Sequence, residues 1–193
     1  MLRYAVPGCA ALAVVASAVA PALAQDSTVD PQLAASRALT REFGERLKTA
    51  LTEALGRGGP GAAIAVCKDA APALAVELSR RSGATVARTS ARLRNPLNAP
   101  PPWAVPVLEQ FAAALAAGRP AAGIEYFART EAGARFMKPI VTEPLCLTCH
   151  GTALAPDVQA ALARLYPEDH ATGFAPGELR GAFVVAWPAA AHP

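Results

Sequence analysis

The segment Cys146-Leu147-Thr148-Cys149-His150 constrains the fold more than any other part of this 193-residue sequence. Two cysteines separated by two residues and followed directly by a histidine form the attachment pattern of c-type haem. Each thiol can add to one vinyl group of the porphyrin, and the adjacent histidine then lies under the ring, where its imidazole can bind the iron. The motif therefore predicts one covalent haem c, held by Cys146, Cys149 and His150, and a chain that folds around it.

Two other uses of the motif stay open at this point. The cysteines could form a thiol redox pair or a disulfide, although the surrounding sequence lacks the βαβ pattern typical of such pairs and His150 would then be incidental. They could also supply half of a zinc site together with Cys67 and one further ligand. Zinc sites of this kind are uncommon in exported proteins.

The N-terminal segment has the three regions of a secretory signal. Arg3 gives it a positive start, residues 10–20 are apolar without interruption, and Ala22-Leu23-Ala24 offers small residues where a signal peptidase cuts. We expect cleavage of a signal peptide 1–24, which leaves residues 25–193 as a single periplasmic domain. The apolar run is too short for a comfortable membrane span, and no later segment is long enough, so no stable membrane anchor is expected after cleavage.

Composition and charge exclude several classes of protein. Hydrophobic residues make up 53% of the chain, which is too high a share for an intrinsically disordered protein. A formal net charge of +3 provides no basic face, so no nucleic-acid partner is expected. The sequence also lacks the sustained heptads of a coiled coil and the repeats of a solenoid.

The apolar pattern predicts helices first and most of the strands later. We expect helices over residues 31–56, 62–81, 103–118 and 155–165, the first two separated by a glycine-rich turn at 57–61. Strands are expected over residues 85–89, 123–129, 134–141 and 179–187. This order predicts an α+β fold in which N-terminal helices pack on an antiparallel sheet. It also differs from a common small cytochrome c, because the haem motif lies late in the chain and no methionine follows it.

A set of motifs resembles a known family. The motifs are Cys67, Leu78-Ser79-Arg80-Arg81-Ser82-Gly83, Arg88-Thr89-Ser90, Leu93-Arg94-Asn95-Pro96-Leu97-Asn98-Ala99-Pro100, Trp103, the run 139–151, Tyr166-Pro167, Ala171-Thr172-Gly173 and Arg180-Gly181-Ala182. Over residues 35–188 the chain is similar to the Tll0287-like family of exported haem c domains. The resemblance implies a PAS-like antiparallel sheet that encloses one covalent haem. The chain departs from the family pattern at Ala104, where an acidic residue is usual, and at His170, where a histidine is unusual.

Cys67 is the leading candidate for the second axial ligand of the iron. It is not needed for attachment, and an unpaired thiol is uncommon in an oxidising compartment. It shares an apolar helical stripe, suited to lying against a porphyrin, with Ala63, Ala70, Ala71, Leu74 and Leu78. A small buried hydrophobic residue is the plain alternative reading. The resemblance implies a cysteine ligand here, while His170, Met137, water or an open position remain alternatives for the iron.

Arg88, Arg92 and Arg94 are candidates to bind the two haem propionates. They cluster on the strand and loop before Asn95-Pro96. A buried carboxylate needs a partner, and a guanidinium group binds one in bidentate geometry. A solvated basic face is the alternative reading of the same cluster.

Three functions fit these features. The leading expectation is a redox- or gas-responsive sensor module, with a small gas such as CO or NO as its ligand and an unidentified signalling partner. The alternative is a soluble electron carrier with an unidentified redox partner. A peroxidase-type enzyme is the least favoured, because two endogenous ligands would block access of a substrate to the iron.

Overall fold

The computed structural model describes residues 29–189 together with Met1. The predicted signal peptide 1–24 therefore lies outside the described residues, apart from Met1. The elements follow the order α1 (Pro31–Ser82), β1 (Thr85–Thr89), α2 (Val105–Ala116), β2 (Tyr126–Thr130), β3 (Gly133–Val141), α3 (Leu147–His150), α4 (Pro156–Leu165) and β4 (Leu179–Pro188). These helices and strands confirm the predicted α+β class. In the part of the chain that is described, no helix is long and apolar enough to cross a membrane.

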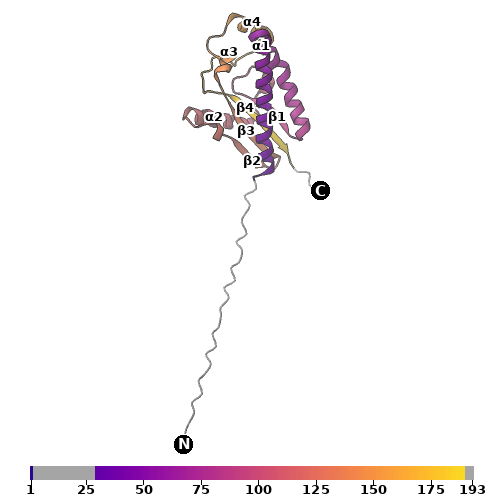
Figure 1. Cartoon of the computed structure of the whole chain (residues 1–193), viewed down its shortest axis with the longest axis vertical. Coiled ribbons are helices and arrows are strands. Elements are labelled where there is room, and N and C mark those ends of the chain that lie inside the picture. The colour runs from indigo at the N-terminus through magenta and orange to yellow at the C-terminus, as the bar shows by residue number, and fades with distance from the viewer. Residues whose placement is uncertain (2–28, 190–193) are drawn as a thin grey trace.

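The long element α1 is a helical hairpin. Its backbone leaves the helical conformation at Gly58 (φ −146°, ψ 16°) and at Gly59 (φ 68°, ψ −168°). The positive φ of Gly59 is one that glycine adopts without steric penalty. The break divides α1 into a first arm, 31–57, and a second arm, 60–82, which lie side by side in Figure 1. The predicted pair of helices with a glycine-rich turn is thus confirmed.

The four strands form one sheet in the order β1-β4-β3-β2, and every neighbouring pair is antiparallel. Strand β1 has the bounds that the sequence predicts. Strands β2 and β3 are joined by the tight turn at Glu131 and Ala132, which confirms the predicted hairpin. The last strand of the sequence, β4, lies between β1 and β3 and therefore connects the two halves of the sheet.

Different helices cover the two faces of the sheet. Side chains alternate along a strand, so neighbouring residues point to opposite faces. Phe136 and Val185 pack against both arms of α1, whereas Met137 and Val184 pack against α2 on the opposite face. Figure 1 shows α2 and α1 on different sides of the strands. The expectation that the N-terminal helices pack on the sheet holds for α1, and α2 forms a separate layer.

A β-bulge interrupts the pairing of β3 with β4. Ile140 pairs with Gly181 and Val141 pairs with Leu179, which leaves Arg180 without a partner in the ladder. A bulge breaks the alternation of side chains and can redirect one of them. Arg180 consequently faces the α1 side of the sheet, opposite to the side that simple alternation predicts.

Gly181→Ala is expected to lower the free energy of unfolding by about 1–3 kcal/mol. At Gly181 the backbone φ is +159°, and an added Cβ would lie only 2.4 Å from the carbonyl oxygen of Thr89. That oxygen belongs to β1, which cannot move away without disturbing its pairing with β4. Denaturant unfolding measures the loss. The matched control is Gly123→Ala, because an added Cβ there meets no atom within 4 Å, and an equal loss in both variants would contradict the steric explanation.

Candidate functional site

A pocket of about 1200 Å³ lies between the α1 hairpin, the sheet and the segment that carries the cysteine motif. Its volume exceeds the ~300–1,000 Å³ of ordinary small-molecule sites, so it has room for a large ligand. The apolar part of its lining includes Phe43, Leu47, Leu51, Leu55, Ala63, Ile64, Ala71, Phe136, Ile140 and Phe183. The predicted site residues that line it are Cys67, Arg88, Arg94, Cys146, Cys149 and His150.

The motif forms a single turn of helix at the wall of the pocket. A 3-10 turn over Pro144–Cys146 leads into α3, so Cys146 and Cys149 are three residues apart on one helical face. Both are half-buried free thiols. The carbonyl of His150 accepts a hydrogen bond from the N–H of Phe174 (2.8 Å), which ties the motif to the segment before β4. Within residues 29–189, no three His, Cys, Asp or Glu side chains group together as a candidate metal-ion site.

The imidazole of His150 is held in one tautomer. Its Nδ1 atom lies 2.6 Å from the carbonyl oxygen of Ala171, which can only accept a hydrogen bond, so Nδ1 carries the proton. Nε2 therefore keeps its lone pair. Burial lowers the pKa of His150 to about 2, and the charges of Arg180 and Arg94 add to this effect. The side chain is thus a neutral imidazole at neutral pH, the form that binds a metal ion.

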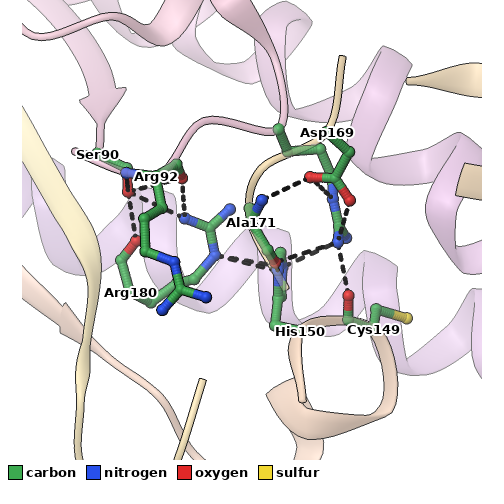
Figure 2. A network of polar contacts seen from close by, with 8 residues as sticks. Ser90, Arg92, Cys149, His150, Asp169, Ala171 and Arg180 are labelled. Carbon is green, nitrogen blue, oxygen red and sulfur yellow. Dashed lines mark hydrogen bonds and ion pairs between the residues drawn. The ribbon is translucent and has the colours of Figure 1, made fainter. Parts of the chain in front are cut away.

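Arg180 lies against the face of the His150 ring. Its Nε atom is 3.2 Å from Nδ1 and 3.4 Å from Nε2 of the imidazole. A donor in the ring plane could not approach both nitrogens this closely without colliding with the carbon between them, so the guanidinium lies over the ring. Its Nη1 atom lies 3.2 Å from Ser90 Oγ and 3.4 Å from the carbonyl oxygen of Arg92, as Figure 2 shows. These contacts restrict rotation of the imidazole.

Arg94 and Asp169 form a buried ion pair beneath the motif. Their side chains are only 8% and 7% exposed, and Arg94 Nη2 lies 3.0 Å from Asp169 Oδ2. The same nitrogen donates to the carbonyl of Cys149 (2.6 Å), and Asp169 Oδ1 accepts from the N–H of Ala171 (2.8 Å). Figure 2 shows Asp169 beside Ala171, whose carbonyl orients His150, so the pair links the motif to that segment. Arg94 is therefore a positioning residue whose Nε and Nη2 donors already have acceptors.

Arg88 and Cys67 face the pocket from two different walls, the sheet and the second arm of α1. The guanidinium of Arg88 lies 5.6 Å from the ring centroid of Phe43. No carboxylate among the described residues forms an ion pair with it, and burial lowers the pKa of Arg88. Burial raises the pKa of the Cys67 thiol, while the charges of Arg88, Arg94 and Arg180 oppose that shift.

Three residues considered in the sequence analysis do not line this pocket. The guanidinium of Arg92 lies 3.9 Å from the ring centroid of Phe174 instead. His170 is exposed, and its backbone N–H donates to the carbonyl of Leu93 (2.7 Å). Met137 is fully buried in the core on the α2 side of the sheet. The structure thus brings Arg88 and Arg94 to the motif and keeps Arg92, His170 and Met137 apart from the pocket.

Sequence reasoning missed Arg180 and Asp169 as site residues. Arg180 appeared only within the run Arg180-Gly181-Ala182, and alternation along its strand predicts the wrong face because the bulge is not visible in the sequence. Asp169 lies 75 residues from its partner Arg94. The only local signal was an acidic residue close after α4, which does not distinguish a buried ion pair from a solvated loop.

Comparison with known proteins identifies the family. No curated protein matches the chain. Among solved structures, the crystal structure of the cyanobacterial haem protein Tll0287 matches with a TM-score of 0.65 over 83% of this chain and 97% of that chain. The sequence identity is 21%, so this likeness shows a shared fold. The model of the family described as Tll0287-like matches residues 14–188, which is most of the sequence. The chain therefore belongs to the Tll0287-like family.

Proposed function

We propose that this chain binds one haem covalently through Cys146 and Cys149, with His150 and Cys67 as the two axial ligands of the iron. The observation that carries the proposal is the gathering of three thiols and a neutral imidazole around one large pocket. The apolar walls suit a porphyrin ring, and the similar solved structure is that of a haem protein. When bound, haem supplies one-electron redox chemistry and an axial position that small gases can occupy.

The arginines take separate roles in this proposal. Arg88 faces the pocket without a carboxylate partner among the described residues and is placed to bind a propionate. Arg94 holds the motif through Cys149 and is already paired with Asp169. Arg92 lies on Phe174, outside the pocket, and receives no role in binding.

We further propose that the protein acts as a periplasmic sensor of redox state or of a small gas. Cys67 lies on the second arm of α1, which joins the first arm through the Gly58–Gly59 break. Burial raises the pKa of the Cys67 thiol, which favours its protonated form when it does not bind iron. Cys67 would supply a thiolate to ferric iron, and the lower charge of ferrous iron would hold that thiolate less tightly. The second arm could then settle in a different position, as a two-state element requires.

A redox titration followed by absorbance and EPR, with and without CO or NO, tests the sensor proposal. We expect the ligand set to change on reduction and the reduced protein to bind CO. An electron carrier would keep both axial ligands in both oxidation states, because a change of ligands slows electron transfer. An unchanged ligand set with no CO binding would therefore overturn the sensor proposal in favour of the carrier.

Cys67→Ser is expected to remove the thiolate character of the low-spin ferric EPR signal and to raise the reduction potential. A thiolate stabilises ferric iron, so its loss should raise the potential on the order of 0.1 V, within the ~0.8 V range that axial ligands set. The control is Ala71→Ser, which adds a hydroxyl to the same wall of the pocket one turn later. A ferric spectrum that is identical in Cys67→Ser and wild type would leave Cys67 as a packing residue.

A further inference from the structure

The interior of the pocket holds two positive charges that no acidic side chain in the described part of the chain neutralises. Five arginines line it: Arg37 and Arg41 are exposed, whereas Arg88, Arg94 and Arg180 are buried or half-buried. Arg94 is paired with Asp169, whereas Arg88 and Arg180 form no ion pair among residues 29–189. The acidic groups at the rim do not compensate, because Glu125 and Glu143 pair with other basic side chains and Glu45 is exposed.

Arg88 has fewer hydrogen-bond partners than Arg180. A guanidinium has five N–H donors, and no protein acceptor within residues 29–189 forms a side-chain hydrogen bond with Arg88. The guanidinium of Arg88 lies over the apolar ring of Phe43, which offers it no hydrogen-bond acceptor. Arg180 uses Nε against the His150 ring and Nη1 on Ser90 and Arg92, which leaves Nη2 for another group. A buried charge without a partner destabilises the folded protein, so the pocket favours an anionic ligand.

The two charges also repel each other. Burial lowers the pKa of Arg180 to about 10, and the positive charges of Arg94 and Arg88 add to this effect. The repulsion between the two positive charges persists until an anion enters. A ligand with two carboxylates would satisfy both groups at once and would match the charge of the pocket.

We infer that Arg88 and Arg180 form a carboxylate-binding subsite that holds the two propionates of haem before the thioether bonds form. The inference rests on the proposed function and adds an order of events, in which recognition by charge precedes attachment. In the later step each S–H adds across a vinyl C=C bond: the sulfur bonds to one carbon and the proton goes to the other. That addition needs no oxidant. The subsite therefore selects a dicarboxylic porphyrin and places its vinyl groups for Cys146 and Cys149.

The experiment separates binding from attachment. The full chain with Cys146→Ala and Cys149→Ala is titrated with ferric protoporphyrin and with its dimethyl ester, which has no negative carboxylates. We expect this attachment-deficient protein to bind the diacid more tightly than the ester. Adding Arg88→Gln should weaken binding of the diacid about 10- to 100-fold, the effect of losing hydrogen bonds to a charged group, and leave binding of the ester unchanged. Arg92→Gln is the matched control and should change neither affinity, because Arg92 does not line the pocket.

A second measurement covers the case in which the double variant fails to fold. With both cysteines intact, Arg88→Gln should lower the fraction of chains that carry covalent haem, and Arg88→Lys, which keeps the charge, should recover part of it. Equal affinity for diacid and ester, or normal haem loading in Arg88→Gln, would overturn the inference. Wild type that binds the diacid selectively but never attaches it would instead contradict the proposed covalent site and leave the subsite intact. A competition experiment adds millimolar phosphate or acetate to the diacid complexes of Arg88→Gln and of its parent. If these anions displaced the diacid to the same extent from both proteins, Arg88 would not bind anions, and the inference would be overturned.

Discussion

Asp169→Ala is expected to lower the free energy of unfolding by about 3–5 kcal/mol, because it leaves a buried guanidinium without its anion. The carboxylate of Asp169 lies 3.0 Å from Arg94 Nη2, and both side chains are more than nine-tenths buried. Asp169 also accepts the N–H of Ala171, so its loss loosens the segment that orients His150. Denaturant unfolding of wild type and variant measures the difference.

The neighbouring residue offers the control for this prediction. Glu168 is exposed, and Glu168→Ala should change the free energy of unfolding by less than about 0.5 kcal/mol. Replacing both members of the pair, with Arg94→Met and Asp169→Leu, should recover part of the loss, since no orphan charge then remains. If Asp169→Ala lost no more stability than Glu168→Ala, the pair would not hold the site together.

His150→Ala should impair haem binding far more than His170→Ala. The imidazole of His150 is neutral, lines the pocket and is oriented by Ala171, whereas His170 is exposed and lies outside the pocket. Cys149 is the residue next to His150, and its bond to the haem would also keep the His150 imidazole at a high effective concentration beside the iron. We expect the yield of haem-loaded protein to fall more than tenfold in His150→Ala, about the loss that follows disturbance of a metal site.

Absorbance spectra and the haem content of purified protein measure this comparison. His170→Ala should match wild type in both. An equal loss of haem in the two variants would show that the assignment of His150 as an iron ligand is incorrect. Unchanged spectra in His150→Ala would show the same.

Local sequence signals predict the secondary structure well because each depends on nearby residues. The glycine-rich turn at 57–61 ends one helix where the structure bends at Gly58 and Gly59. The two strand segments that bracket Thr130-Glu131-Ala132-Gly133 predict the hairpin of β2 and β3. The cysteine motif and the apolar stripe of Cys67 indicate one site, and the structure brings both to the same pocket.

Features that depend on distant residues were not predictable in the same way. Arg180 reaches the His150 ring because a bulge redirects it, and the bulge follows from the pairing of β3 with β4. Arg92 lies beyond the end of β1, where alternation no longer fixes direction, so its distance from the pocket could not be read from its closeness to Arg88 and Arg94. The packing of α2 on the second face of the sheet likewise depends on tertiary contacts.

The most direct test of the covalent site is a pyridine haemochrome spectrum of protein matured in a periplasm, recorded after extraction with acidified organic solvent. Thioether bonds survive this extraction, so we expect the haem to stay with the polypeptide and to give a c-type haemochrome. Cys146→Ala should weaken or abolish that signal, because one of the two bonds is lost. Haem that moves entirely into the organic phase, or purified protein that contains stoichiometric zinc and shows no Soret band, would contradict the assignment of Cys146, Cys149 and His150.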